Sequence, residues 1–379
     1  EMSSRGLGDV YKRQIHSLLL SSNFYFRSEI GTLSDGHKQL TNYEMVSLLS
    51  YALVNTTPDD TLLALAAQAE PLSTAQLRAQ AERLLALPAA NPAMVSVYKD
   101  YLKLDLVLSR PKAEELGFSD SVRADVLASA ELTLADKIAN NPAITDVFLG
   151  DSFYVNSNID YLFGAGTTSA ALTEVSVNGT ERQGLLNHPA FLAVHSTLAN
   201  SGIVKRGVFT LEQLLCQELP DPPGDVMPQP IPEGIDPDTT SERDLLQITH
   251  SAQAACIGCH QIIDPAGFGF ENFDAIGRYR TEEKGSVMID ASGTLSNVGE
   301  TVLTYNNSAE YANVLATSPQ MQACVSRRFL ENFLGQDVSM QSCEVKKYQR
   351  LLSEKGGSVQ DLLYALIELE SFSKRQSAQ

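Results

Sequence analysis

Long apolar runs, basic residues and tryptophan are scarce or absent in this sequence. No apolar run approaches the roughly 20 residues that cross a bilayer as a helix. Lys and Arg number 28 against 46 Asp and Glu, so the formal net charge is -18. A phosphate-binding surface needs clustered Lys and Arg, which makes nucleic acid a poor candidate partner. A glycine-rich phosphate loop, a Gly-x-Ser-x-Gly elbow and a His-Glu-x-x-His helix are also absent, and this argues against a hydrolase.

The chain is long enough for two domains. With 379 residues, 43% of them apolar, it can bury a large core, and that favours two domains or more over one. Seven of the sixteen prolines lie between Pro220 and Pro237. Because proline fixes φ and removes a donor, they predict an extended linker at residues 220–238. The predicted organisation is a helical domain at 15–219, this linker, and a second domain at 239–379.

The first fourteen residues are interpreted separately. Residues 1–14 read like a translated sequencing adapter, and they are excluded from fold reasoning as a cloning scar would be. On this interpretation the chain is truncated at its N-terminus, and a signal peptide is expected to be missing with the true start. The lack of a signal peptide therefore says nothing about the compartment.

Helical patterns cover most of the remaining chain. Apolar stripes and end signals predict helices at 43–55, 73–87, 120–140, 207–219, 308–316, 322–335 and 358–372, and one more that starts at a capping-box pattern at 239–242 and runs to a cysteine motif. Asn42 and Ser73 are expected N-caps, and Pro142 is expected to follow the end of its helix. Helices are therefore the main element of both predicted domains.

One short segment has the pattern of a strand pair. An Asn-Gly pair at 178–179 lies between residues 175–177 and 180–182. This pair favours a two-residue turn and so predicts a small β-hairpin. The predicted fold class is mainly α: a helical N-terminal domain and a C-terminal domain built on the cysteine motif, with this minor β-hairpin.

The cysteine motif is Cys256-Ile-Gly-Cys259-His260. This pattern is typical of covalent haem c attachment. Two residues between the cysteines bring both thiols along one helical turn to the two vinyl carbons, and the next residue projects its imidazole toward iron. A redox disulfide usually lacks the adjacent His and lies in a βαβ context. Zinc would need a second Cys pair to complete a tetrahedral set. The motif therefore predicts one covalent haem c, with His260 as the proximal ligand of the iron.

The sequence around the motif resembles a known protein family. The resemblance rests on several segments: Gln261–Arg280, Leu185–Pro189, Lys205–Cys216 with the proline stretch after it, Leu48–Tyr51 with Pro58–Asp60, and Cys324 with Phe333–Gly335 and Cys343. They are similar to planctomycete-type and myxobacterial cytochrome c-like proteins, which are built from several domains of unknown function. The resemblance implies a bacterial, extracytoplasmic protein, periplasmic or on the cell surface, and a cytochrome c-like haem domain. It does not supply a reaction.

The sixth ligand of the iron stays open. Met321 precedes the helix predicted at 322–335, and small cytochromes often take a distal Met from such a position. Met288 lies in an extended segment, and His250 lies six residues before Cys256. All three side chains have the chemistry of an axial ligand, and an open sixth position is a further alternative.

Other side chains near the motif have expected supporting roles. A backbone carbonyl in a loop around Asp264 and Pro265 is a candidate acceptor for the Nδ1–H of His260. Arg278 and Arg280 are candidate partners of the haem propionates, with surface solvation as the alternative. The nearby phenylalanines, Phe268, Phe270 and Phe273, are expected to wall the haem pocket.

Three cysteines lie outside the motif. Cys324 and Cys343 enclose a short loop between two helical segments, and in an oxidising compartment a disulfide between them is the first expectation. Cys216 is then free, although pairings that involve Cys216 stay open.

The function predicted from these features is single-haem electron transfer outside the cytoplasm. The acidic surface favours a redox partner with a basic docking patch. Two alternatives remain: a haem-dependent oxidoreductase of peroxidase or oxygenase type, and a binding or scaffold module that contains haem. An electron carrier or an oxidoreductase subunit is favoured over an independent enzyme.

Overall fold

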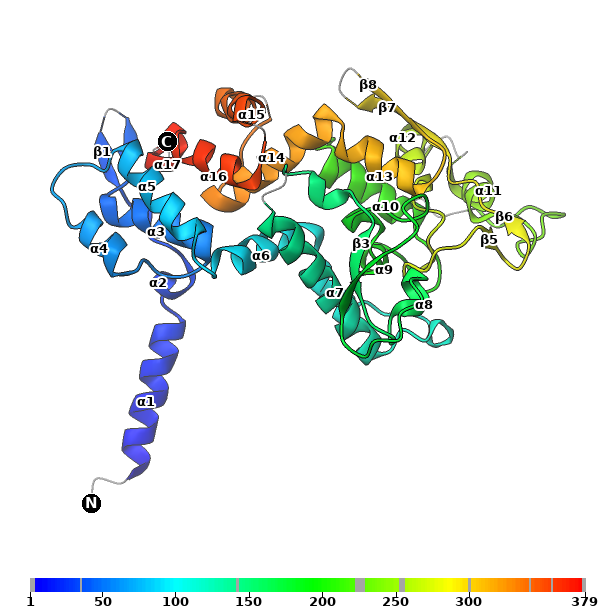
Figure 1. Cartoon of the computed structure of the whole chain (residues 1–379), viewed down its shortest axis with the longest axis horizontal. Coiled ribbons are helices and arrows are strands. Elements are labelled where there is room, and N and C mark those ends of the chain that lie inside the picture. Colours follow the sequence, from blue (N-terminus) through cyan, green and yellow to red (C-terminus); the bar gives the residue numbers. More distant parts are fainter. Residues whose placement is uncertain are drawn as a thin grey trace. The chain divides into compact units, whose positions relative to one another are not determined.

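Helices dominate the structure. The computed structural model describes residues 4–34, 36–140, 143–221, 229–251, 256–298, 301–340, 342–355 and 357–376. Most elements in this part of the chain are helices, and each of its sheets has only two or three strands (Figure 1). The predicted class, mainly α with minor β, is confirmed.

The chain forms two compact units. The first comprises Glu1–Ala93, Phe333–Gln336 and Leu363–Gln379, and the second comprises Met94–Asn332 and Asp337–Leu362. Part of the predicted linker, residues 222–228, lies outside the described residues. The domain boundaries on either side of that linker stay predictions.

The first unit packs helices beside a small antiparallel sheet. Its elements are α1 (Ser4–Leu19), α2 (Ser22–Tyr25), β1 (Thr32–Ser34), β2 (His37–Gln39), α3 (Asn42–Val54), α4 (Asp60–Ala66), α5 (Thr74–Leu85), α17 (Glu370–Ser373) and β9 (Lys374–Gln376). α3 contacts both α4 and α5. β2 pairs with β1 and, far along the chain, with β9. Three helices have residues in both units: α6 (Ala90–Leu102), α14 (Pro319–Leu334) and α16 (Val359–Ile367).

The second unit contains the cysteine motif. Its elements are α7 (Asp120–Ala139), β3 (Ser152–Val155), α8 (Asp160–Phe163), β4 (Thr173–Ser176), α9 (Pro189–Val194), α10 (Ile203–Phe209), α11 (Glu242–Leu246), α12 (Ile257–Phe268), β5 (Glu282–Glu283), β6 (Val287–Met288), β7 (Gly293–Val298), β8 (Thr301–Tyr305), α13 (Ser308–Ala316) and α15 (Cys343–Lys355). The β7–β8 hairpin lies beside α12 and α13 (Figure 1). Short 3-10 or π turns connect several of these helices.

Most predicted helices are confirmed, because their end signals act locally. Ser73 caps α5 with a capping box, in which the Ser73 side chain accepts from the N–H of Gln76 and the Gln76 side chain accepts from that of Ser73. The N-cap of α3 is Thr41 rather than the expected Asn42. α7 ends at Ala139, while Pro142 lies outside the described residues.

Three predicted helices have different bounds. The helix expected at 207–219 begins at Ile203 and ends in a π turn at Thr210–Leu214. The helix expected at 322–335 is α14 and starts at Pro319. The one expected at 358–372 is two helices, α16 and α17, because Leu369 between them is extended.

The capping box expected at 239–242 is also displaced. Ser241 is the N-cap of α11, and its side chain accepts from the N–H of Asp244. A π turn at Gln247–Ser251 follows α11. The described part of this segment ends there, and residues 252–255 are not described.

The predicted hairpin at 175–182 is wrong. β4 pairs antiparallel with β3, more than fifteen residues earlier, with Phe153 opposite Val175. The Asn-Gly pair does lie in a turn, in which the N–H groups of Glu181 and Arg182 donate to the carbonyl of Asn178. Arg182 is then drawn into the interior, where its guanidinium donates to the carbonyls of Leu162 and Gly277 at 2.7 Å. With Arg182 buried in this way, residues 180–182 do not form the second strand of the predicted hairpin.

A close helix crossing positions the motif helix. α10 and α12 cross where Gly207 faces Ile263 and Gly267 faces Ile203. A Cβ on Gly207 would lie 2.2 Å from the Ile263 carbonyl oxygen, and one on Gly267 would lie 2.1 Å from that of Ile203. Only glycine allows this approach. The crossing therefore fixes α12, which carries the cysteine motif, against α10.

A buried arginine extends this attachment. Arg206 of α10 has no exposed surface, and its guanidinium donates to the carbonyls of Leu192, Phe270, Phe273 and Asp274 at 2.8–3.2 Å. The bonds to Phe270, Phe273 and Asp274 satisfy carbonyls of the loop that follows α12. The second half of α12 and the loop after it are thereby tied to α10.

Candidate functional site

The cysteine motif opens a helix. Cys256 is the residue before α12, and its carbonyl accepts from the N–H groups of Cys259 at 3.1 Å and His260 at 3.0 Å. Cys256, Cys259 and His260 therefore share the first helical turn. Both motif cysteines are free thiols, with Cys256 buried and Cys259 partly exposed. This is the arrangement that the spacing of the motif predicts.

A carboxylate, rather than a backbone carbonyl, holds the imidazole. Asp264 lies one turn after His260, and its Oδ1 is 2.7 Å from His260 Nδ1. The expected loop at Asp264 and Pro265 is wrong, because α12 continues through Pro265 to Phe268. Residues four apart share one helix face, which brings the carboxylate within hydrogen-bond distance of the imidazole Nδ1. Since Asp264 takes the Nδ1–H, the Nε2 lone pair of His260 is free to bind a metal.

The Asp264 carboxylate is itself held by a second element. Ser251, in the π turn after α11, donates its hydroxyl to Asp264 Oδ2. His260 and Asp264 are only 7% and 3% exposed. The imidazole is thus held in one orientation by a chain of two hydrogen bonds, and both His260 and Asp264 are buried.

His250 is the one candidate axial ligand that the structure brings to His260. The two imidazole rings lie edge to face with their centroids 4.4 Å apart. Among the described residues, the buried Nδ1 of His250 has no hydrogen-bond partner. Burial, with a smaller contribution from His260, lowers the pKa of His250 below its ordinary value, which favours the neutral form that binds metals.

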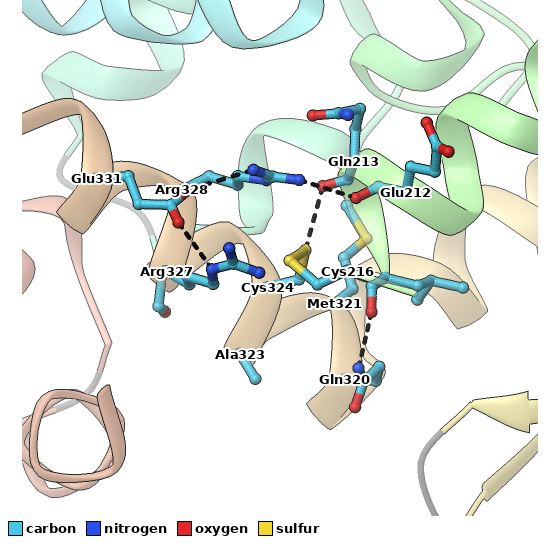
Figure 2. The surroundings of a disulfide bond; sticks show 12 residues. Glu212, Gln213, Cys216, Gln320, Met321, Ala323, Cys324, Arg327, Arg328 and Glu331 are labelled. Carbon is cyan, nitrogen blue, oxygen red and sulfur yellow. Dashed lines mark hydrogen bonds and ion pairs between the residues drawn. A yellow bond between two sulfur atoms is a disulfide. The ribbon is translucent and has the colours of Figure 1, made fainter. Parts of the chain in front are cut away.

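The two candidate methionines lie elsewhere. Met288 is in β6 and is 66% exposed. Met321 is fully buried in α14, beside a disulfide bond (Figure 2). Neither residue is among those that line the cavity at His260. Of the three candidate axial ligands, only His250 therefore lies next to His260.

An open cavity of about 460 Å³ lies at the motif helix. It is lined by Arg243, Gln247, Ser251, Ile257, His260, Gln261, Asp264, Pro265, Phe268, Gly293 and Thr294. Its walls thus come from α11, the following π turn, one face of α12 and the start of β7. Both apolar and polar residues line it, and His260 and Asp264 are its buried ionisable groups.

Arg243 is a cavity residue that sequence reasoning missed. Its guanidinium donates to the carbonyls of Asp290 and Ser292 at 3.0 and 2.8 Å and pairs with the Asp290 carboxylate. Its Cζ also lies 4.0 Å from the centroid of the Phe268 ring. It is the only Lys or Arg in the described segment 229–251. A single basic residue in an acidic segment before the motif is the sequence feature that could have indicated a role for Arg243.

Arg278 and Arg280 form carboxylate pairs and do not line the cavity. Arg278 is bonded to Asp274 at 3.0 Å and its side chain is 52% exposed. Arg280 lies 4.0 Å from Glu271 and 3.7 Å from Glu283. Burial raises the pKa of Glu271 to about 7. The pairs stabilise the loop after α12, and the structure does not bring either arginine to His260.

Only one of the three phenylalanines expected in the pocket lines it. Phe268 does so, whereas Phe270 packs against Phe191 and Tyr311, and Phe273 packs against Tyr279. Residues 270–273 have left the helix, so their side chains no longer follow its cavity face.

The expected Cys324–Cys343 disulfide is wrong. Cys216 pairs with Cys324, with Cα atoms 5.4 Å apart (Figure 2). Gln320, Cys324 and Arg328 share one face of α14. Gln320 and Arg328 donate to the carbonyls of Leu215 and Glu212 at 2.7 and 3.0 Å, so this face lies against residues 212–215, directly before Cys216. Cys343 begins the next helix and is an exposed free thiol.

The fold and site define a mainly α-helical protein with a Cys-x-x-Cys-His motif at the start of a half-buried helix. Two family models match parts of the chain. Residues 182–283, which include the motif, match PSCyt3, described as a protein of unknown function (DUF1588). Residues 40–164 match PSD4, described as a protein of unknown function (DUF1592). The resemblance to planctomycete-type, cytochrome-like domains of unknown function is confirmed at this level.

The other comparisons find no match. No curated protein and no solved structure matches the chain. Within the described part of the chain, every helix is too short or too polar to cross a bilayer.

Proposed function

We propose that the chain is a mono-haem c-type cytochrome that carries electrons outside the cytoplasm. The observation that carries the proposal is the shared first turn of α12, where two free thiols precede a buried imidazole whose Nε2 is available. The cavity beside this turn offers apolar walls from Ile257, Pro265 and Phe268. Cys256 and Cys259 would hold the haem by thioether bonds and His260 would ligate its iron. When bound, haem supplies reversible one-electron chemistry.

The metal chemistry of the residues fits haem better than a bare ion. Among the described residues there is no group of three or more His, Cys, Asp and Glu side chains placed to hold a metal. Haem brings four nitrogen ligands of its own, so one or two axial side chains are enough. The positive Arg243 at the cavity wall is a better candidate than Arg278 or Arg280 for pairing with a propionate.

The proposed compartment and partner rest on two further features. The Cys216–Cys324 disulfide is typical of an oxidising compartment. The net charge of -18 favours a redox partner with a basic docking surface, because complementary charges steer encounter. The proposed compartment and the proposed partner both depend on the proposed electron-transfer function.

The decisive test is covalent haem attachment. We expect the chain, produced together with a haem c maturation system, to carry a pigment that survives denaturation. A Cys256→Ala/Cys259→Ala variant should lose the pigment completely, since both thioether bonds are gone. Cys343→Ala is the matched control, because it removes an exposed free thiol outside the motif. A colourless wild-type chain beside a correctly matured control cytochrome would refute the proposal.

We also propose His250 as the sixth ligand. Its ring touches that of His260, and its buried Nδ1 lacks a partner among the described residues. At this contact distance the rings must separate before haem can lie between them. We expect a low-spin absorption spectrum that becomes high-spin in His250→Ala and is unchanged in Met288→Ala. A Met-to-iron charge-transfer band in the wild type would instead assign a methionine.

A second candidate function is peroxide reduction. The buried Asp264–His260 pair favours it, because a carboxylate partner makes the metal-bound imidazole more electron-donating than a backbone carbonyl does. Peroxide reduction requires that the sixth coordination position of the haem iron be open. A high-spin wild-type spectrum, tight cyanide binding and turnover of peroxide with an electron donor would support it over simple electron transfer.

A further inference from the structure

The Asp264 carboxylate is buried, and its side-chain partners among the described residues are an imidazole and a hydroxyl. Oδ1 binds His260 Nδ1 at 2.7 Å and Oδ2 accepts from Ser251. In the described part of the chain no Lys or Arg forms a salt bridge with Asp264, and His260 is its one partner that can carry a positive charge. Arg243 lines the same cavity but pairs with Asp290. The negative charge of Asp264 is therefore directed at His260.

This arrangement has a consequence for any metal bound at Nε2. A carboxylate that accepts the Nδ1–H raises the basicity of the imidazole and orients its ring. A more basic axial ligand stabilises the more positive, oxidised metal. A neutral backbone carbonyl, which was the acceptor expected from the sequence, would stabilise the oxidised metal less. The low exposure of both side chains strengthens the effect, because water screens the interaction little.

We infer that Asp264 is a positioning residue that holds His260 in its metal-binding tautomer and lowers the midpoint potential of the haem. The inference rests on the proposed function, since it needs a haem at His260. Ser251 moderates the effect, because its hydroxyl withdraws charge from the carboxylate. The two residues should thus act on the potential in opposite directions.

The test is a spectroelectrochemical titration of the haem-loaded protein. Asp264→Asn keeps an oxygen acceptor and removes the charge. We expect the reduction equilibrium to shift about tenfold toward the reduced form, which is about 59 mV for one electron. Asp264→Glu, which keeps the charge, should recover part of this shift. Ser251→Ala should move the potential the other way, by a smaller amount.

The controls separate the possible failures. Glu282→Gln removes an exposed carboxylate in β5, and its potential should match the wild type. If Asp264→Asn does not fold, the downward shift in Ser251→Ala still tests the inference. Haem attached with unchanged potentials in both variants would overturn the inference and leave the proposed function intact. A wild-type chain without covalent haem would overturn the proposed function itself.

Discussion

Gly267→Ala is expected to destabilise the second unit strongly. The new Cβ would lie 2.1 Å from the carbonyl oxygen of Ile203, and backbone on both sides of the crossing cannot yield as a flexible side chain would. We expect a loss of about 3 kcal/mol in the free energy of unfolding, at the upper end of the usual cost of overpacking. Urea unfolding followed by far-ultraviolet circular dichroism measures it, because the chain has no tryptophan.

Gly258→Ala is the matched control for this prediction. Gly258 lies in the same helix, and a Cβ there meets no heavy atom within 4 Å. Alanine is the better helix former by up to about 1 kcal/mol, so this variant should be unchanged or slightly more stable. Equal stability of Gly267→Ala and the wild type would show that α10 and α12 do not cross as closely as the structure has them. Separated helices would also move His260 from its cavity.

Removal of the disulfide is the second large effect expected. Cys216 and Cys324 are 108 residues apart, and a crosslink that closes a loop of about 100 residues stabilises a protein by up to about 4.7 kcal/mol through its unfolded state. We expect Cys216→Ser/Cys324→Ser to lose about 3–5 kcal/mol in urea unfolding, within the range of measured disulfides.

Cys343→Ser provides the control, because Cys343 is exposed and free. Its stability should equal that of the wild type, since surface substitutions usually change stability by less than about 0.5 kcal/mol. Peptide mapping without reductant should recover the Cys216 and Cys324 peptides joined. A crosslinked pair containing Cys324 and Cys343 would contradict the structure and restore the pairing first expected from the sequence.

Features that depend on a few neighbouring residues were predicted well. The capping box at Ser73 and Gln76 lies within one turn, and the predicted helix at 308–316 matches α13. The common turn of Cys256, Cys259 and His260 follows from the same short range. Such signals are readable because their energy comes from adjacent backbone groups.

Pairings between distant segments were predicted poorly. β4 pairs with β3 and not with the residues that follow its Asn-Gly turn. Cys324 has two candidate partners in the sequence, and its neighbours on α14 select Cys216. Nothing local distinguishes these alternatives, because the choice depends on which surfaces pack together.

The supporting groups of the site show the same division. Pro265 reads as a helix breaker, since it lacks an N–H and crowds the preceding turn, and this hid the contact between Asp264 and His260. α12 nevertheless continues, held by the Gly207–Gly267 crossing and by Tyr311, whose hydroxyl donates to the Ala266 carbonyl at 2.7 Å. Tertiary packing thus overrides a local preference.

The sequence by itself determined that the chain is mainly helical and that two thiols and an imidazole share one turn, because both depend on residues within a few positions of each other. Only the tertiary structure decided that Asp264 and Ser251 hold the imidazole, that His250 is its neighbour and that Arg243 lines the cavity. These contacts join α12 to separate elements. Their energy exists only after the helices have packed, which is why residue order alone did not reveal them.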